Sequence, residues 1–156
     1  MKRASGVLMH ISSLWGEYSE GSFGAEAMEW IDFLADNGFT YWQVLPFCQT
    51  DQYNSPYSSF SAFSGNPFFI DMPTLHRDGL LTADELAAAR QQTPHACEFD
   101  RLHRERFRLL EKAAARFTDD DALDRFRLRD PYPDEYCRFM TLKAQNHQQH
   151  DEPHFA

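Results

Sequence analysis

The sequence predicts an α/β fold in which a strand–helix–strand unit is followed by a mostly helical region. Two short apolar runs, Gly6–Ile11 and Tyr41–Leu45, have the length and composition of buried strands. An amphipathic helical pattern lies between them, and beyond Pro73 the chain shows helical periodicity without further strand patterns. These observations divide the chain into an α/β part, residues 1–72, and a helical part, residues 73–156.

The first strand leads through a loop into the first helix. The segment Trp15–Gly24 holds three glycines and two serines, a composition typical of loops. From Ala25 to Asn37 apolar residues recur with i, i+3, i+4, i+7 spacing, which predicts an amphipathic helix. Its expected apolar stripe consists of Ala27, Trp30, Ile31 and Leu34, widened by Met28 and Phe33. Gly38 suits the position that follows a helix C-terminus.

The second strand ends at Pro46 and closes the strand–helix–strand unit. About 30 residues separate the two runs, which is long enough for a crossover between parallel strands. The residues alone leave two architectures open, an α/β barrel or a doubly wound sheet. Both bind ligands at the C-terminal ends of their strands. That edge holds residues 10–24 and 47–66.

The rest of the chain is predicted to be helical after one short extended run at 68–72. A capping box, Thr82 to Glu85, opens a helix that runs to about Gln91. Asp100 is expected to cap a helix over residues 101–117, whose inward positions are Leu102, Phe107, Leu110 and Ala114.

Two more helices are expected before a polar tail. Acidic residues at 119–121 suit the N-terminus of a helix that reaches about Leu128, and Pro131 and Pro133 break it. One face of the last helix carries Tyr136, Phe139, Met140 and Lys143. Because two parallel strands do not form a stable covered sheet alone, we expect this chain to be the front of a larger fold.

Composition excludes several classes of function. The net charge of −9 and the absence of a basic face argue against nucleic acid as a partner. No apolar stretch is long enough to span a membrane, and no signal peptide follows the N-terminus. Cys48, Cys97 and Cys137 show no pairing pattern, so we expect free thiols and a cytoplasmic location.

The sequence also predicts no cofactor and no metal site. Its glycines match neither a phosphate loop nor a dinucleotide fingerprint, and no G-x-S-x-G motif occurs. Histidines 147, 150 and 154 could chelate a metal but lack a closed tetrahedral spacing, which favours an unstructured tail. His10 and Asp71 lie near expected strand ends, where either a catalytic or a structural role is open.

The loop after the second strand is the best candidate for a ligand site. It combines four aromatic residues, Tyr53, Tyr57, Phe60 and Phe63, with hydroxyl and amide side chains at Asn54, Ser55, Ser58, Ser59 and Ser61. Sugars present apolar CH faces and a rim of hydroxyls, so rings and neutral hydrogen-bonding groups suit them. The alternative is that these aromatic residues pack into the protein core.

Several segments resemble the N-terminal region of bacterial 4-α-glucanotransferases. These enzymes, also called amylomaltases or disproportionating enzymes, form glycoside hydrolase family 77. The similar segments cover residues 3 to about 145: SGVLMH at 5–10, YWQVLP at 41–46, SPYSSFSAFSGNP at 55–67, DGLLT at 78–82 and FMTLK at 139–143. The chain departs from the family's pattern at Trp15, at residues 18–21 and at Asn54, where the family often has Asp.

The resemblance implies a TIM (β/α)8 barrel with helical insertions that acts on maltodextrins and other α-1,4-glucans. Residues 1–72 would begin the barrel with its substrate loop, and residues 73–156 would belong to an inserted, mostly helical subdomain. The implied reaction transfers a glucan segment to the 4-hydroxyl of an acceptor sugar by retaining double displacement. The family's Ser-Pro-Tyr segment lies by the donor sugar, which implies substrate binding by Ser55 and Tyr57.

The resemblance assigns no catalytic residue to this chain. The family's nucleophilic Asp, acid/base Glu and second Asp lie on later strands, so the barrel is expected to be incomplete and the chain alone inactive. Two other functions remain open: a non-catalytic glucan-binding module that uses the same loop, and an unrelated scaffold whose aromatic residues are all core.

Overall fold

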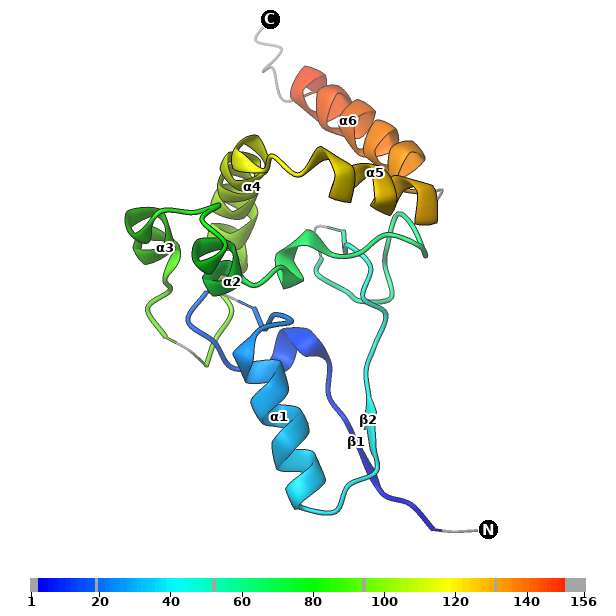
Figure 1. Cartoon of the computed structure of the whole chain (residues 1–156). Helices are drawn as coiled ribbons and strands as arrows, with labels where there is room; N and C mark the ends of the chain where they lie inside the picture. Colours follow the sequence, from blue (N-terminus) through cyan, green and yellow to red (C-terminus); the bar gives the residue numbers. More distant parts are fainter. Residues whose placement is uncertain (1–2, 19, 52, 94, 131, 151–156) are drawn as a thin grey trace, which may run out of the picture.

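The computed structural model describes residues 3–18, 20–51, 53–93, 95–130 and 132–150. It shows a mixed α/β chain with two parallel strands and several helices (Figure 1). The elements, in chain order, are β1 (Gly6–Leu8), the 3₁₀ helix η1 (Ile11–Ser13), α1 (Ala25–Asp36), β2 (Tyr41–Gln43), the 3₁₀ helix η2 (Pro67–Phe69), α2 (Met72–Arg77), α3 (Ala83–Ala89), α4 (Phe99–Arg116), α5 (Asp120–Arg129) and α6 (Pro133–His150).

The predicted parallel strand–helix–strand unit is confirmed. β1 and β2 pair in parallel with Val7 opposite Trp42, and α1 lies between them in the chain. Figure 1 shows α1 running alongside the two strands. The Trp42 indole donates a hydrogen bond to the Met9 carbonyl at 2.6 Å, and the rings of Trp30 and Trp42 meet edge to face at 6.5 Å. The hydrogen bond joins the two strand segments, and the ring contact packs α1 against one face of the strand pair.

The strands are shorter and more exposed than the sequence suggested. They end at Leu8 and Gln43 instead of Ile11 and Leu45, and Leu8 and Tyr41 are 59% and 65% exposed. The apolar runs predicted strands covered on both faces, but here α1 covers one face only. The prediction of buried strands is therefore wrong for this chain as it folds alone.

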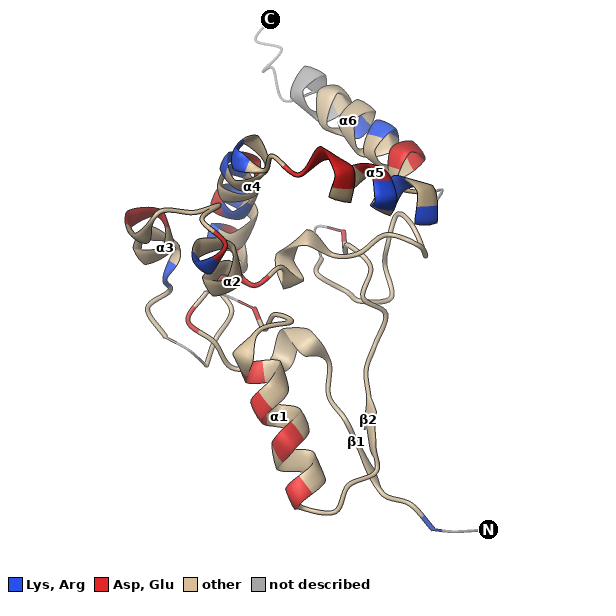
Figure 2. Cartoon of the chain, in the orientation of Figure 1, with Lys and Arg blue, Asp and Glu red and all other residues tan. Residues whose placement is uncertain are grey.

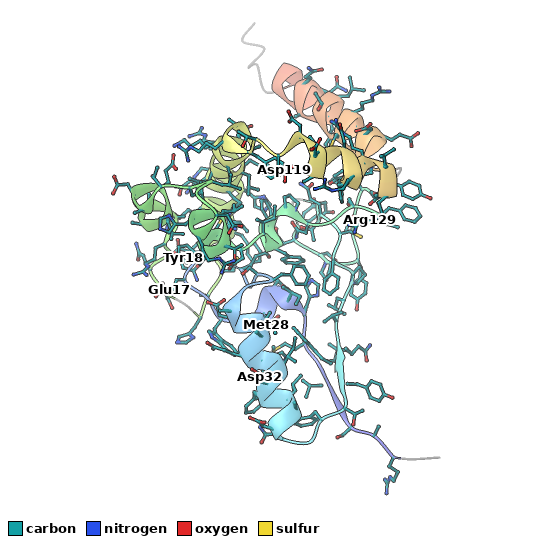
Figure 3. All side chains as sticks on the ribbon, viewed as in Figure 1. Glu17, Tyr18, Met28, Asp32, Asp119 and Arg129 are labelled. Atoms are coloured by element: carbon teal, nitrogen blue, oxygen red, sulfur yellow. The ribbon has the colours of Figure 1, made fainter. Side chains whose placement is uncertain are left out.

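Helix α1 agrees closely with its predicted bounds, but its apolar stripe is only partly buried. Ala27 and Leu34 are buried, whereas Met28, Ile31 and Phe33 are exposed. Figure 3 shows the side chains of Met28 and Asp32 on neighbouring turns of this helix. The apolar stripe of α1 is therefore wider than the part of the helix that packs against the rest of the described chain.

The predicted extended run at 68–72 is wrong, because two side chains fold it into helical turns. The Asn66 side-chain oxygen accepts a hydrogen bond from the Phe68 amide at 3.0 Å, which starts η2. The Asp71 carboxylate accepts one from the Thr74 amide at 2.9 Å and caps α2. Pro73 fits this first turn, where its missing N–H costs nothing.

The four helices predicted from Thr82 onward are present as α3 to α6, whereas α2 was not predicted. The capping box of α3 is present, with Thr82 and Glu85 exchanging hydrogen bonds of 2.9 and 3.2 Å. Helix α4 begins one residue after Glu98, whose side chain forms no capping hydrogen bond, and the predicted cap Asp100 lies within its first turn. Leu102 is buried as predicted, but the other buried side chains are Arg106 and Ala113. The predicted Phe107 and Ala114 are exposed, and Leu110 is half-buried.

The last two helices form one end of the molecule (Figure 1). The Asp119 carboxylate accepts a hydrogen bond from the Ala122 amide at 2.8 Å, as an N-cap should. Asp119 and Arg129 mark the two ends of α5 in Figure 3. Helix α6 continues through His147 and His150, so the expectation of an unstructured tail there is wrong. His154 lies outside the described residues.

Two apolar clusters form the core. One joins the first strand–helix–strand unit to η2 and consists of Ile11, Leu14, Ala27 and Phe69. The other joins α2 and α4 through Met72, Leu81 and Ala113. The three cysteines are free, as predicted.

Arg106 of α4 joins the helical region to the first part of the chain. Its buried guanidinium donates hydrogen bonds to the carbonyls of Phe68 and Ile70, at 3.4 and 3.3 Å, and to that of Tyr18. Buried carbonyls need partners, and a guanidinium offers five donors in a fixed plane. One side chain therefore holds two loop segments against α4.

Glu20 lies in the same buried region and is poorly solvated. It is 7% exposed, and one carboxylate oxygen finds no hydrogen-bond partner among the described residues. Burial raises the pKa of Glu20 to about 7, although the charge of Arg106 opposes this change. A carboxyl group with this pKa makes stability depend on pH near neutrality.

We predict that Glu20→Gln stabilises the fold at pH 8 but not at pH 4. The Glu20 contribution is fully present below its unfolded pKa of about 4.5 and is lost as the pH rises to about 7. Above that pH the variant should be more stable than the wild type by about 2–3 kcal/mol. Urea unfolding across pH measures this, with Glu29→Gln, an exposed change on α1, as control. Identical pH profiles for wild type and Glu20→Gln would contradict the prediction.

We also predict that Arg106→Lys lowers the free energy of unfolding by about 2–4 kcal/mol. An ammonium group cannot serve three separated carbonyls with the planar geometry of a guanidinium. Arg104→Lys, an exposed change on the same helix, should alter stability by less than about 0.5 kcal/mol. Equal stabilities of the two variants in urea unfolding would show that Arg106 is not the link described above.

Candidate functional site

The loop that joins β2 to η2, residues 47–66, is almost free of charge. Asp51 is its only charged residue in the sequence. Figure 2 shows the strands and this loop largely in tan, whereas α4 and α5 carry mixed acidic and basic side chains. A neutral surface rich in hydroxyls and rings suits an uncharged polar ligand better than an anion.

Asp51 closes the loop on itself. Its carboxylate accepts hydrogen bonds from the Tyr53 amide at 2.9 Å and from the Ser58 hydroxyl at 2.6 Å. The Asp51 amide donates to the Ser58 carbonyl at 3.1 Å, and Thr50 and Ser59 form an antiparallel bridge. The Ser58 hydroxyl, with the Tyr53 amide, holds the pKa of Asp51 below its usual range. Asp51 is therefore an ionised structural group and not a proton donor.

Ser55 and Tyr57 lie inside the closed segment, residues 50–59, which the bridge between Thr50 and Ser59 defines. The Ser55 carbonyl accepts a hydrogen bond from the Ser58 amide at 3.0 Å, which tightens the turn around Tyr57. The Tyr57 side chain is 74% exposed, and Ser55 is half-buried. Neither side chain has a hydrogen-bond partner among the described residues.

Asn54 and His103 form a contact that the sequence did not predict. Asn54 has a φ of 56°, in the left-handed region that Asn tolerates better than most residues. The His103 Nε2 atom of α4 lies 2.8 Å from the Asn54 side-chain oxygen, and the His103 ring meets Phe68 edge to face at 5.2 Å. This contact spans 49 residues of sequence, so no local pattern could reveal it.

The four loop aromatics divide into two pairs. Tyr53 and Tyr57 are 77% and 74% exposed and point away from the core. Phe60 contacts Phe139 of α6 at 6.2 Å between ring centroids, and Phe63 stacks on Tyr132 at 4.5 Å. Phe60 and Phe63 are themselves 38% and 67% exposed, so the alternative that the loop aromatics pack into the core is wrong: the tyrosines are open to solvent, and the phenylalanines contact the last helical region at the surface.

A groove with a volume of about 500 Å³ lies between residues 61–67 and the facing ends of α5 and α6. Its aromatic lining consists of Phe63, Phe126, Tyr132 and Tyr136. This volume is in the range of small-molecule sites. Ser55 and Tyr57 do not line it, so the structure places the groove and the predicted sugar contacts on different parts of the loop.

His10 and Asp71 have structural roles. The buried His10 ring accepts a hydrogen bond from the Leu45 amide at Nδ1, at 3.2 Å, and stacks on Phe47 at 5.9 Å. Burial lowers the pKa of His10, which keeps the ring neutral and able to accept. Asp71 caps α2 and also accepts a hydrogen bond from the Ser22 hydroxyl at 2.9 Å.

The described residues offer no catalytic pair of carboxylates at the loop. A retaining displacement on a sugar uses two carboxyl groups about 5–5.5 Å apart. Asp51 is committed to loop hydrogen bonds, and Glu20 lines a separate small cavity beside Trp15 and Arg106. In the part of the chain that the structure describes, no cluster of His, Cys, Asp and Glu could hold a metal, and none of its helices has the length and apolar character to cross a bilayer.

Three comparisons relate the chain to known proteins. A family model described as 4-alpha-glucanotransferase matches residues 9–154. The 4-alpha-glucanotransferase of Clostridium butyricum is 41% identical over 140 residues, which cover 86% of this chain and 28% of that protein. The 4-alpha-glucanotransferase of Streptococcus pneumoniae serotype 4 is 49% identical over 118 residues, 74% of this chain and 23% of that protein.

The solved amylomaltase from Streptococcus agalactiae, in complex with acarbose, has the same fold over the matched region. It superposes with a TM-score of 0.87 at 36% identity, over 92% of this chain and 30% of that one. The chain therefore spans less than a third of the length of these relatives.

We predict that Asn54→Ala destabilises the chain more than Asn54→Gly. Both changes remove the contact with His103, but only alanine places a β-carbon in the left-handed region. The difference in the free energy of unfolding should be about 1 kcal/mol. Urea unfolding followed by tryptophan fluorescence measures it. Equal stabilities would indicate that the loop relaxes out of this conformation.

Proposed function

Since the chain belongs to the 4-alpha-glucanotransferase family, we propose that it is part of an enzyme that transfers α-1,4-glucan segments between sugars. The observation that carries the proposal is the family match over residues 9–154, which includes the whole closed loop. The acceptor would be the 4-hydroxyl of another glucan, and the substrates would be maltodextrins. No cofactor is needed for this reaction.

We propose that residues 1–72 begin a (β/α)8 barrel and that residues 73–156 belong to a helical subdomain inserted into it. The parallel pair of β1 and β2 with α1 between them supports the first part. The run of helices from α2 to α6 supports the second. In such barrels the loops that follow the strands carry the active site, and the candidate loop follows β2.

In this proposal Ser55 and Tyr57 form a binding surface for the donor sugar. The exposed Tyr57 ring offers a face to sugar CH groups, and the hydroxyls of Tyr57 and Ser55 would form hydrogen bonds with sugar hydroxyls. Asp51 fixes the turn that presents them, which lowers the entropy lost on binding. The likeness to an amylomaltase solved with acarbose, an analogue of α-glucans, supports this choice of ligand.

The transfer would follow a retaining double displacement. A carboxylic acid protonates the glycosidic oxygen while a carboxylate attacks the anomeric carbon, and an acceptor hydroxyl then takes the glucan from the covalent intermediate. The role of the present chain is to bind and orient the donor sugar and to limit the access of water, because water would compete with the acceptor. The reacting carboxyl groups would come from outside the described residues.

The second candidate is a glucan-binding module without catalysis. The exposed tyrosines favour binding, and the described loop lacks a pair of carboxylates for chemistry. The two functions differ in one measurement, the disproportionation of maltotriose. Formation of glucose and longer dextrins by the purified 156-residue chain would contradict the proposal that the reacting carboxyl groups lie elsewhere.

We predict that Tyr57→Ala weakens maltodextrin binding by about tenfold, or about 1.4 kcal/mol. Removal of the ring takes away the apolar face, whereas Tyr57→Phe keeps it and should lose less affinity. Titration calorimetry of the chain with maltoheptaose measures both. Tyr41→Ala is the control, because Tyr41 is similarly exposed but lies on β2 away from the loop. Equal affinities for Tyr57→Ala and Tyr41→Ala would show that Tyr57 does not bind the sugar.

A further inference from the structure

We propose that one face of α6, formed by Tyr136, Phe139 and Lys143, positions the loop that carries Ser55 and Tyr57. These three residues contact the loop and not the proposed sugar, so they are positioning residues. The inference rests on the proposed function, since it concerns the readiness of that loop to bind glucan. It assigns a role to α6 that goes beyond packing.

The first contact is a hydrogen bond at the start of the closed segment. The Tyr136 hydroxyl donates to the Gln49 side-chain oxygen at 2.5 Å. Gln49 is only 9% exposed and directly precedes Thr50, whose bridge to Ser59 closes the loop. A buried amide oxygen needs a partner, so this bond holds the first side of the closed segment in place.

The second contact lies at the other side of the closed segment. Phe60 directly follows Ser59, the other half of the bridge. The Phe139 ring meets Phe60 at 6.2 Å between centroids, and the Lys143 ammonium lies 3.1 Å from the Phe60 ring centroid. This is the geometry of a cation–π interaction. Ring packing and charge therefore hold the second side against the same helix.

The spacing of the three residues makes the arrangement a single surface. Positions 136, 139 and 143 follow the i, i+3, i+7 rule, so they lie on one side of α6. Their partners, Gln49 and Phe60, directly flank the bridged pair Thr50 and Ser59.

The charge of Lys143 also acts on the centre of the loop. The Ser58 hydroxyl is the main cause of the low pKa of Asp51, and the nearby Lys143 ammonium adds to it. Asp51 is the residue that ties the turn around Tyr57. Lys143 therefore supports the turn mainly through the Phe60 ring, and its charge adds a smaller effect at the Asp51 carboxylate.

The geometry has a functional consequence. A sugar gains affinity from Ser55 and Tyr57 only if the turn is already in place, because ordering it on binding would cost entropy. Loss of a contact with α6 should therefore loosen the turn first and weaken glucan binding as a result. A merely structural role would lower global stability without a selective effect on the loop.

The test compares three changes on α6 in the full 156-residue chain. Tyr136→Phe removes only the hydroxyl that bonds Gln49, and Lys143→Gln removes the cation over Phe60. Arg138→Ala, an exposed change on the same helix, is the matched control, and Lys143→Arg restores a cation. Hydrogen exchange of the Asn54 and Ser58 amides reports the loop, and calorimetry with maltoheptaose reports binding.

We expect both Tyr136→Phe and Lys143→Gln to accelerate loop exchange and weaken maltoheptaose binding by roughly two- to tenfold. Arg138→Ala and Lys143→Arg should behave as the wild type. Exchange in β1 and β2 should not change in any variant, which separates loop loosening from global unfolding.

Other results would overturn the inference. Loop exchange at the wild-type rate in both variants would show that α6 does not position the loop. Faster exchange with unchanged maltoheptaose affinity, while Tyr57→Ala still weakens binding, would show that positioning does not serve the sugar. If the wild type binds no maltoheptaose, the proposed function fails in this chain, and loop exchange still decides whether α6 holds the loop.

Discussion

The buried guanidinium of Arg106 is the interaction on which the rest of the structure depends. It donates hydrogen bonds to carbonyls of the loop after η1, of η2 and of Ile70, which follows η2, and so fixes α4 against these segments. Phe69 of η2 belongs to the first core cluster, against which Phe47 at the start of the candidate loop also packs. Without a donor of this shape, buried carbonyls would remain unpaired, at a cost of about 1–3 kcal/mol each.

The candidate site depends on a second constraint, the closure of the loop. Residues 50–59 fold back on themselves through Asp51 and the bridge between Thr50 and Ser59, and helices then hold the result from two sides. His103 of α4 meets Asn54, and α6 meets Gln49 and Phe60. A neutral loop with few charges has little to order it by ion pairs, so hydrogen bonds and ring contacts with the helical region do so. The helical region therefore positions the proposed sugar-binding surface of Ser55 and Tyr57, although it supplies no proposed contact with the sugar.

Local patterns predicted elements well where a local interaction decides the structure. The helix that begins at Ala25, the capping box at Thr82 and the acidic helix N-terminus at residues 119–121 depend on residues within one or two turns, and all are present. The extended conformation predicted for residues 68–72 is wrong, because the caps supplied by Asn66 and Asp71 start helical turns there. The predicted inward face of α4 is right at Leu102 and wrong at Phe107 and Ala114, because Arg106 occupies a buried position that a hydrophobic pattern cannot reveal.

By itself the sequence determined the parallel strand–helix–strand start, the helical character of the remainder, and the membership in a glucanotransferase family carried by the segments YWQVLP and SPYSSFSAFSGNP. Only the tertiary structure decided how the aromatic loop is used. It left Tyr53 and Tyr57 exposed, packed Phe60 and Phe63 against the last helical region, and paired Asn54 with a histidine 49 residues away. The reason is physical: helix caps and strand patterns are local, whereas the environment of a loop is set by whichever distant segments pack against it.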